Sequence, residues 1–314
     1  SYNVHQSYAT GNVVDNGDEG YVGGLIGENI GATVGGSYAT GAVTSNTSYP
    51  YVGGLVGYNE GSITNSHATG AVSLSGAVAP SGYDGYAGGL LGYNDATVTG
   101  SWATGNLNVN SLYTYAGGLI GENSGTVSKS YAKGNVVGGN RANDGYFGGL
   151  IGDNSGPVTQ SYATGDVSGG QDSYIGGLIG YSNGTLAEVY ARGDVTGRDE
   201  SDIGGLVGYL DSTLDQGYST GAVSVSDGST TSDIGGLIGY DNSGGGITNS
   251  YWDRTTSGIT SMDQGAGNIA NDIGITGQTT AQLKALPAGL SATYWKVLAG
   301  KNNGFPYLKG VAGQ

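Results

Sequence analysis

The chain has no cysteine, little proline and few basic residues. Its 314 residues contain 0 Cys, 5 Pro and 1 Met, and 10 Lys+Arg stand against 25 Asp+Glu. Without cysteine the chain can form neither a disulfide nor a thiolate metal site, which suits a cytosolic or a secreted protein alike. A formal net charge of −15 argues against a nucleic-acid partner, because binding to phosphates depends on clustered lysine and arginine. No stretch approaches the roughly 18 consecutive apolar residues of a membrane-spanning helix, so membrane insertion is not expected.

Glycine is the residue in excess, with 66 copies in 314 residues, against a usual share of about 7%. The glycines do not recur at every third residue, which excludes collagen. Abundant valine, isoleucine, leucine and tyrosine argue against disorder. The chain opens with Ser1-Tyr2, without an initiator methionine or the features of a signal peptide. We therefore interpret it as a fragment of a longer protein.

Two short blocks recur along the chain, which is the signature of a repeat protein. Gly-Gly-Leu-(Ile/Val/Leu)-Gly begins at Gly23, Gly53, Gly88, Gly117, Gly148, Gly176, Gly204 and Gly235. Ser-Tyr-Ala-Thr-Gly, or a variant of it, begins at Ser7, Ser37, Ser66, Ser101, Ser130, Ser161, Val189 and Gly217. The distance from the first block to the second is nearly constant, whereas the distance back varies and is longest between Ser73 and Tyr86. One half of each unit therefore has a set length, and insertions collect in the other half.

Each unit of about 30 residues has short β-favouring segments separated by glycine, asparagine, serine and aspartate. Such a unit cannot bury its apolar face alone but can do so when stacked on copies of itself. The sequence therefore predicts an all-β fold, a parallel β-solenoid (β-helix) of eight to nine coils over residues 1–249. The chirality of parallel connections favours a right-handed solenoid. Asn29, Asn59, Asn94, Asn123 and Asn154 share one position, which predicts an asparagine ladder. A β-propeller is the alternative, but its blades need about 40–50 residues.

The pattern leaves two directions open for the side chains of the aromatic residues. The threonine of Ser-Tyr-Ala-Thr-Gly is replaced by Lys133 and Arg192, so that position is expected to face solvent. The aromatic residue two positions earlier lies on the same face of the strand. This favours a solvent-facing aromatic stack over a core of small residues, and a buried tyrosine row is the alternative. In Gly-Gly-Leu-Ile-Gly both Leu25 and Ile26 are aliphatic, so alternation does not decide which faces inward.

The repeat decays over residues 250–314, which we predict to form a degenerate last coil and a C-terminal cap. Residues 279–286 have the pattern of a short capped helix that ends at Pro287. An open last coil exposes apolar surface and unpaired strand edges. We expect five apolar side chains to cover that coil, namely Leu283, Leu286, Trp295, Phe305 and Leu308.

The two blocks, with the ending Ser-Tyr-Trp-Asp…Thr-Thr-Ala-Gln-Leu…Gly-Phe-Pro-Tyr-Leu, resemble the GLUG-motif repeat regions of large bacterial surface and secreted proteins. Examples are filamentous-haemagglutinin-like adhesins of two-partner secretion systems and some immunoglobulin-A1 metallopeptidases. The resemblance covers nearly the whole chain. It implies an extracellular β-solenoid module, secreted or at the bacterial cell surface, but no particular ligand.

The sequence has few residues in arrangements that are typical of catalytic sites. The two histidines, His5 and His67, lack partners at zinc-binding spacing, and no Gly-x-Ser-x-Gly elbow is present. Acidic residues collect in the variable half of the unit, where a solvated edge explains them. Asp15-Asn16-Gly17-Asp18-Glu19 and Asp199-Glu200-Ser201-Asp202 offer oxygen ligands for a structural calcium ion. No other cofactor is expected.

These observations predict a non-catalytic rod and binding module of a bacterial surface or biofilm-matrix adhesin, monomeric as a fragment. Its partners would be glycans or receptors on host or bacterial surfaces. A carbohydrate-binding module that uses its Tyr/Trp rows as sugar platforms is an alternative, and a glycan-active β-helix enzyme is another. Arg192-Gly193-Asp194 is a tripeptide that integrins read, although drift of the repeat also explains it. The candidate binding residues are Tyr8, Tyr38, Trp102, Tyr131, Tyr162, Tyr190, Arg192, Gly193 and Asp194.

Overall fold

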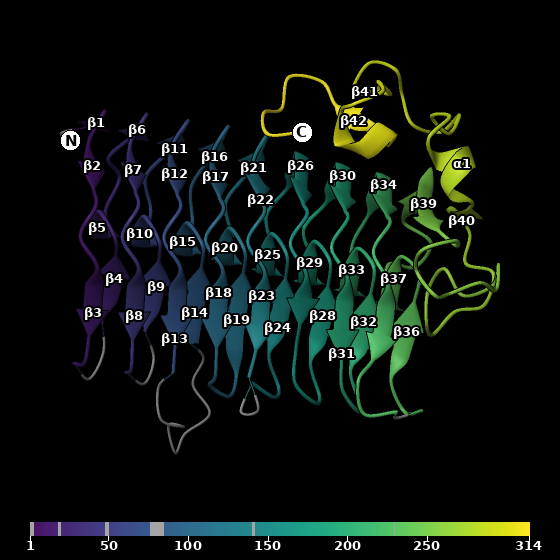
Figure 1. Cartoon of the computed structure of the whole chain (residues 1–314), viewed down its shortest axis with the longest axis horizontal. Helices are drawn as coiled ribbons and strands as arrows, with labels where there is room; N and C mark the ends of the chain where they lie inside the picture. Colours follow the sequence, from purple (N-terminus) through teal and green to yellow (C-terminus); the bar gives the residue numbers. More distant parts are fainter. Residues whose placement is uncertain (1–2, 18–19, 48–49, 76–84, 140–141, 229) are drawn as a thin grey trace.

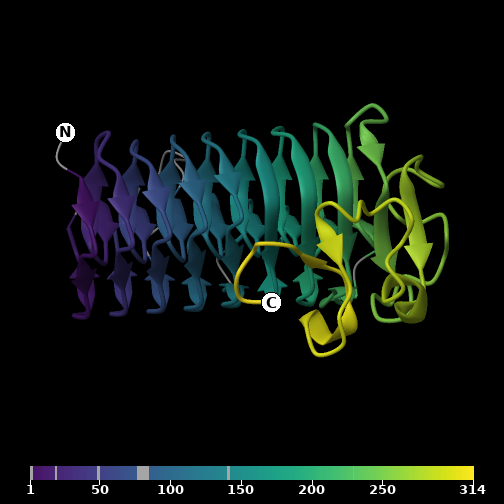
Figure 2. The ribbon, with the colours of Figure 1, turned by 90° about the horizontal axis from the view of Figure 1, so that it is seen from above.

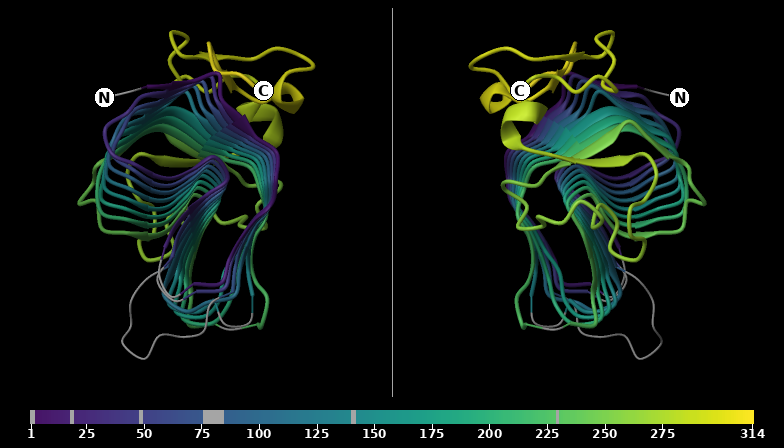
Figure 3. Two further views of the ribbon diagram at one scale, coloured as in Figure 1. Left: turned by 90° about the vertical axis from the view of Figure 1, so that its left-hand side faces the viewer. Right: turned by 90° about the vertical axis from the view of Figure 1, so that its right-hand side faces the viewer.

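The computed structural model describes residues 3–17, 20–47, 50–75, 85–139, 142–228 and 230–314. They form a parallel β-solenoid of about nine turns, as the sequence predicted, with coils stacked side by side along a straight axis (Figure 1). Seen from the N-terminal end, the chain runs clockwise as the coils recede, so the solenoid is right-handed (Figure 3). Most of the Ser73–Tyr86 insertion lies outside the described residues.

Coils one to eight each contribute strands to four sheets, whereas the described residues of coil nine contribute strands to sheet A alone. Within these sheets every strand pairs in parallel with strands of the neighbouring coils. Sheet A has two columns of short strands in its first half. Its first column is β1 (Val4–His5), β6 (Val34–Gly35), β11 (Ile63–Thr64), β16 (Val98–Thr99) and β21 (Val127–Ser128). Its second column is β2 (Tyr8–Ala9), β7 (Tyr38–Ala39), β12 (His67–Ala68), β17 (Trp102–Ala103) and β22 (Tyr131–Ala132). The columns join in β26 (Val158–Ala163), β30 (Leu186–Ala191) and β34 (Leu214–Ser219), followed by β38 (Ile247–Thr248), β39 (Ser250–Asp253) and β40 (Ile275–Gln278).

Sheets B, C and D each have eight strands among the described residues. Sheet B is β3 (Val13–Asp15), β8 (Val43–Ser45), β13 (Val72–Leu74), β18 (Leu107–Val109), β23 (Val136–Gly138), β27 (Val167–Ser168), β31 (Val195–Gly197) and β35 (Val223–Val225). Sheet C is β4 (Tyr21–Gly23), β9 (Tyr51–Gly53), β14 (Gly85–Gly88), β19 (Thr114–Gly117), β24 (Tyr146–Gly148), β28 (Tyr174–Gly176), β32 (Asp202–Gly204) and β36 (Asp233–Gly235). Sheet D is β5 (Ile26–Asn29), β10 (Val56–Asn59), β15 (Leu91–Asn94), β20 (Ile120–Asn123), β25 (Ile151–Asn154), β29 (Ile179–Ser182), β33 (Val207–Leu210) and β37 (Ile238–Asp241).

The cross-section of the solenoid has two parts, each with its own apolar core. In the end views the coil is wide where sheets A and D face each other and narrow where B and C do (Figure 3). The wide part is filled by aliphatic residues of sheets A and D. The narrow part is filled by apolar residues of sheets B and C, of which Phe147 is the largest. The chain passes between the two parts at the Gly-Gly pair, which ends each strand of sheet C.

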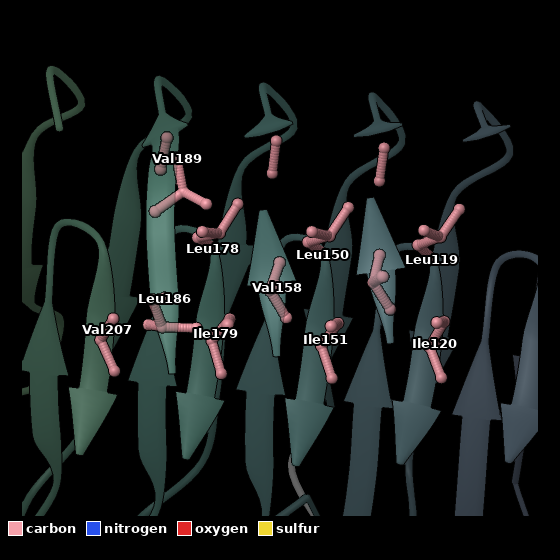
Figure 4. Close-up of a cluster of buried hydrophobic side chains, with 14 of the residues drawn as sticks. Leu119, Ile120, Leu150, Ile151, Val158, Leu178, Ile179, Leu186, Val189 and Val207 are labelled. Carbon is pink, nitrogen blue, oxygen red and sulfur yellow. The ribbon is translucent and has the colours of Figure 1, made fainter. Parts of the chain in front are cut away.

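The Gly-Gly-Leu-Ile block does not alternate because the chain bends within it. Leu55 and Val56 are both fully buried in the wide core, and the same holds for Leu119 with Ile120. The bend falls on the glycine and leucine between sheets C and D. It turns two consecutive side chains toward one core, as the labelled pairs in Figure 4 show. This resolves the question that the alternation pattern left open.

The Gly-Gly pairs are required by close approach rather than by backbone conformation. A Cβ on Gly149 would lie 2.1 Å from the Gly177 oxygen and 2.9 Å from the Ala163 Cβ. The alanine of Ser-Tyr-Ala-Thr-Gly thus packs against the second glycine of the pair, and both must be small. None of the glycines in this block has a positive φ. Close contact between coils, and not a left-handed backbone, therefore requires glycine at these positions.

The left-handed backbone lies elsewhere, directly before each Ser-Tyr block. This position has a positive φ in all nine coils, mostly with residues other than glycine: Gln6, Gly36, Asn65, Gly100, Lys129, Gln160, Glu188, Gln216 and Asn249. It turns the chain between the two columns of sheet A. The serine that follows accepts a hydrogen bond from the equivalent backbone N–H one coil earlier, as Ser66 Oγ does from Ser37 N at 3.1 Å. These bonds keep the turn in register from coil to coil.

The predicted asparagine ladder is present and buried. Asn59 Nδ2 donates to Asn94 Oδ1 at 2.8 Å, and Asn94 Nδ2 donates to Asn123 Oδ1 at 2.8 Å. Each amide also donates to a carbonyl in its own turn, as Asn94 does to the Ala96 oxygen at 2.7 Å. The ladder ends where Ser182 replaces asparagine. Both hydrogen-bonding groups of these buried side chains are thereby satisfied, which removes the cost of burying them.

The last coil is closed by two different parts of the C-terminal region. Trp252 takes the place of the small alanine of earlier coils, is fully buried and joins the wide core with Ala266. Residues 254–278 follow at the end of the rod and add β40 to sheet A (Figure 1). The remaining elements are α1 (Thr280–Leu283), β41 (Trp295–Lys296), η1 (Asn302–Gly304) and β42 (Tyr307–Leu308). The helix is capped, as predicted, and its cap is a capping box in which the side chains of Thr279 and Gln282 bond each other's backbone.

The segment after residue 278 does not lie where the sequence indicated. It turns back along the flank of the solenoid, over sheet A (Figure 2). Leu283, Trp295, Phe305 and Leu308 pack there against tyrosines of coils five to nine, and Leu286 lies beside them. We call residues 279–314 the C-terminal strap. The expectation that these five residues cover the open end was wrong, because Trp252 and residues 254–278 already fill that end.

Candidate binding surfaces

The aromatic residues of the Ser-Tyr-Ala-Thr-Gly blocks form one continuous stack, which we call the aromatic ladder. Its members are Tyr8, Tyr38, His67, Trp102, Tyr131, Tyr162, Tyr190, Tyr218 and Tyr251. From Tyr8 to Tyr218, consecutive ring centroids are 4.1–5.8 Å apart, with interplanar angles of 1–9°. The stack follows from the parallel register, which places the same residue type one coil above another.

The ladder lies outside the coil, but only its first half is open. Tyr8 is 64% exposed and Trp102 is half-buried, whereas Tyr162 is 1% exposed and Tyr190 is fully buried. The prediction of an outward stack over small residues is therefore right for coils one to four. In coils five to nine the tyrosines are buried, not by the core of the coil but by the strap.

The strap satisfies the hydroxyl groups that it covers. Tyr162 Oη donates to the Ala312 oxygen at 2.9 Å, and Tyr190 Oη donates to Gln314 Oε1 at 3.0 Å. Tyr218 Oη donates to the Pro306 oxygen at 2.6 Å. Trp295 packs on the rings of Tyr190 and Tyr218, at centroid distances of 6.0 and 5.5 Å. This set of partners makes the strap a specific intramolecular occupant of the ladder.

The charged side chains of the Arg192-Gly193-Asp194 tripeptide contact the strap and the neighbouring coils. Arg192 Nη1 donates to Asn302 Oδ1 of the strap at 2.8 Å, and its guanidinium lies 4.8 Å from the Phe305 ring. Gly193 is buried at the bend between β30 and β31, where the chain passes from sheet A to sheet B. Asp194 Oδ1 accepts from the Ala222 N–H at 2.8 Å, which continues the bond between Asp194 N and Asp166 Oδ1 one coil earlier. Both charged side chains therefore have partners within the chain.

Stacking limits what the open part of the ladder offers to a ligand. Tyr38 and His67 stack at 9°, and His67 and Trp102 stack at 8°. Because each interior ring has a neighbour on both faces, only ring edges and polar tips face solvent. A flat sugar platform needs a free ring face, so the open rungs present a row of edges instead. Of the predicted binding residues, the structure leaves Tyr8 exposed and Tyr38 and Trp102 partly exposed, and it covers Tyr131, Tyr162 and Tyr190.

A second aromatic surface, which the sequence analysis did not identify, lies where sheets C and D meet. We call it the tyrosine strip. Sheet C contributes Tyr21, Tyr51, Tyr86, Tyr115, Tyr146 and Tyr174, and sheet D contributes Tyr58, Tyr93, Tyr181, Tyr209 and Tyr240. Sheets C and D meet at an inward fold of the coil (Figure 3). The two columns touch across it, as Tyr51 and Tyr58 do at 5.5 Å and Tyr174 and Tyr209 at 5.0 Å.

The periodic residues of the strip, though not their meeting in one surface, were detectable from the sequence by a further pair of regularities. The residue two positions before Gly-Gly is tyrosine in six of the eight coils, and Asp202 and Asp233 in the other two. The residue after Gly-Gly-Leu-Ile-Gly is always tyrosine or an acid. Most of these tyrosines are half-buried, and the strap does not reach them. The strip therefore runs along the rod as a partly exposed row of phenols with interspersed carboxylates.

Two carboxyl groups near the C-terminal end of the rod have perturbed acidity. Burial, and then the neighbouring carboxylate of Asp233, raises the pKa of the Asp202 carboxyl to about 7. The two residues are paired in register in sheet C, so their like charges lie one coil apart. Burial also raises the pKa of Asp272 to about 7, helped by its hydrogen bond and charge interaction with Asp241. Both groups favour the protonated form in the folded chain.

We expect the folded chain to lose stability as the pH rises from about 4 to about 7. Over that range the native carboxyl of Asp202 still holds its proton, whereas the unfolded one, with its ordinary pKa of 3.8, has released it. Asp202→Asn mimics the protonated side chain and should flatten the pH dependence of the unfolding midpoint. Asp95→Asn, at an exposed position of another coil, is the control. An Asp202→Asn chain with the wild-type pH profile would contradict this expectation.

The structure gives no support to a calcium site in the residues it describes, where no group of three or more His, Cys, Asp or Glu is arranged to hold a metal ion. In the first predicted loop, Asp15 Oδ1 accepts from the Gly17 N–H at 3.0 Å, while Asp18 and Glu19 lie outside the described residues. In the second, Asp199 accepts hydrogen bonds from Thr231 and from the Glu200 N–H.

Within the described ranges, none of the helices has the length and apolar character needed to cross a membrane.

Comparison with known proteins gives one match. Residues 48–73 match the family described as the GLUG motif. This stretch spans most of one coil, from β9 to β13, and its two blocks recur in register in the other coils. The chain carries a GLUG-repeat region. No curated protein and no solved structure matches it.

Proposed function

We propose that this GLUG-repeat solenoid is a rod-like adhesive module of a bacterial surface or biofilm-matrix protein, which binds its ligand without converting it. The tyrosine strip is the observation that carries the proposal. It places eleven phenol rings in two touching columns on a rigid scaffold. Repetition at the coil spacing of about 4.8 Å suits an extended, repetitive ligand that lies along the rod axis.

The charge of the strip narrows the class of ligand. Glu122, Asp153, Asp202 and Asp233 replace tyrosines within the two columns, and the chain as a whole carries a formal charge of −15. Nearby carboxylates repel anions, which disfavours sulfated or sialylated glycans and nucleic acids. Phenol hydroxyls and ring edges can donate to and pack against neutral sugar hydroxyls and C–H groups. The proposed ligand is therefore a neutral polysaccharide.

The proposal extends to the location, the parent protein and the oligomeric state of the region. A secreted or surface location in a filamentous-haemagglutinin-like, two-partner secretion adhesin is supported by the GLUG motif and by a solenoid with neither cysteine nor a basic surface. We propose that the region acts as a monomer, without membrane insertion.

Binding to an array of neutral and anionic oligosaccharides tests the proposal. We expect neutral oligomers to bind and Tyr93→Ala, in the middle of the strip, to weaken binding at least tenfold, about 1.4 kcal/mol. Tyr8→Ala, on the open ladder, is the matched control and should bind as the unchanged chain does. Three results would count against the proposal: no binding at all, which indicates a spacer; loss of binding with Tyr8→Ala alone; or shortening of the oligosaccharides, which indicates an enzyme.

A further inference from the structure

Two pairs of tyrosines in sheet D are arranged as near-parallel, partly exposed neighbours. Tyr58 and Tyr93 lie in register on adjacent strands, with centroids 4.8 Å apart and an interplanar angle of 7°. Tyr209 and Tyr240 repeat this geometry at 4.9 Å and 7°. In each pair the residues are 35 or 31 positions apart in the sequence, yet the backbone holds their rings face to face.

Tyr58 also has a proton acceptor in place. Its hydroxyl donates to Glu60 Oε1 at 3.0 Å, and Glu60 is exposed on the turn that follows the same strand. Burial and the Glu60 carboxylate raise the pKa of Tyr58 above its ordinary value of 10.0, so the phenol stays protonated. Oxidation of a phenol to its neutral radical requires loss of that proton, and the Glu60 carboxylate is positioned to receive it.

We propose that the Tyr58–Tyr93 pair is a site of oxidative cross-linking, at which a one-electron oxidant such as a peroxide-activated haem peroxidase joins the two rings as dityrosine. The proposal is independent of the glycan-binding function, because it rests on ring geometry and on Glu60 alone.

The chemistry balances with hydrogen peroxide as the terminal oxidant. Each phenol loses one electron to the peroxidase and one proton; Glu60 accepts the proton of Tyr58, and solvent accepts that of the partly exposed Tyr93. The two resulting radicals carry spin on the ring carbons ortho to oxygen, and one new Cε–Cε bond forms between the facing rings. The two ring hydrogens at that bond then move to the oxygens and restore both phenols. The sum is two tyrosines and one H₂O₂ giving one dityrosine and two waters.

The link would have a structural consequence in a chain with 0 cysteines. It joins coils two and three across 35 residues, and closing a loop of that length reduces the entropy of the unfolded chain, as a disulfide does. The buried half of the aromatic ladder provides an internal comparison. Tyr162 and Tyr190 stack at 4.8 Å and 1°, but the strap buries them and their hydroxyls donate to neutral oxygens. This pair has the same ring geometry, but the strap keeps the oxidant away and, among the described residues, no carboxylate is placed to accept a phenol proton. We therefore expect it to stay unlinked.

Treatment of the dilute full-length chain with a haem peroxidase and H₂O₂ tests the proposal. We expect blue dityrosine fluorescence, an intact mass lower by two hydrogens per link, and a Tyr58–Tyr93 cross-linked peptide in the digest, all in monomeric protein. Tyr93→Phe should abolish that peptide, and Glu60→Gln should lower its rate of formation severalfold. Tyr113→Phe, at an exposed tyrosine outside both columns, is the control and should leave the yield unchanged.

Three results would overturn the proposal. One is a yield that rises with protein concentration and appears only in dimers, which shows coupling between molecules. Another is a peptide map dominated by other pairs, such as the tilted neighbours Tyr21 and Tyr58, which stand at 35°. The third is a Glu60→Gln chain that links at the wild-type rate, which removes the acceptor role of Glu60. A gain in the thermal midpoint of the linked monomer over the untreated chain would further support a staple between coils.

Discussion

Replacement of Gly149 by alanine is expected to lower the stability of the solenoid by at least about 3 kcal/mol, at the upper end of the usual cost of overpacking. The added Cβ would lie 2.1 Å from the backbone oxygen of Gly177 and 2.9 Å from the Cβ of Ala163. Neither obstacle is the end of a flexible side chain, so the backbone of two adjacent coils must move. That movement opens the interface between the wide core and the narrow core in the middle of the rod.

Gly11→Ala is the control, because a Cβ there meets nothing within 4 Å. We expect that variant to stay within about 0.5 kcal/mol of the unchanged chain. Thermal unfolding of the two variants side by side, followed by far-UV circular dichroism, measures the difference. Equal midpoints would show that the Gly-Gly blocks are tolerant of Cβ atoms and that the tight contact between coils does not limit stability.

Trp295→Ala is expected to release the strap from the aromatic ladder. The indole is 1% exposed and packs on the rings of Tyr190 and Tyr218. Truncation of a buried tryptophan typically costs about 3–5 kcal/mol, which is a large share of what can hold a single short segment in place. We expect residues 279–314 to become sensitive to protease while the coils stay folded. The uncovered tyrosines should then promote association of the chains.

The neighbouring Tyr294→Ala is the matched control, since that side chain is 36% exposed. Limited proteolysis with mass mapping reports on the strap, and light scattering reports on association. A Trp295→Ala chain whose strap is as protected as that of Tyr294→Ala would show that the hydrogen bonds of Tyr162, Tyr190 and Tyr218 suffice to hold it.

The solenoid itself is predictable from the sequence because its determinants are local and repeated. The recurrence of Gly-Gly-Leu-Ile-Gly sets the coil length, and the column from Asn29 to Asn154 predicts a ladder that the structure confirms. The inward direction of both Leu55 and Val56 was not predictable, because it depends on a bend between two sheets rather than on strand alternation. The role of the Gly-Gly pairs likewise depends on atoms of the next coil.

The surfaces were harder to predict than the core. The outward direction of Tyr8 and Tyr38 followed from the charged residues that replace threonine two positions later. The burial of Tyr162 and Tyr190 did not, because the strap that covers them lies 124 to 150 residues away in the sequence and shares no repeat with them. The tyrosine strip needs two facts together, a periodic tyrosine and an inward fold of the coil, and only the first is visible in a sequence.

The strap also implies an order of events in time. Each coil bonds only to neighbours about 30 residues away, so coils can form one after another as the chain emerges. The strap reaches back 180 residues from Gly313 to Lys133 and 150 from Ala312 to Tyr162, so it is made after the coils that it covers. Its docking surface exists only once coils five to nine have stacked in register. A protease-resistant strap is therefore a marker of finished assembly of these coils, and a chain whose coils five to nine have not stacked would be recognisable by a protease-sensitive strap.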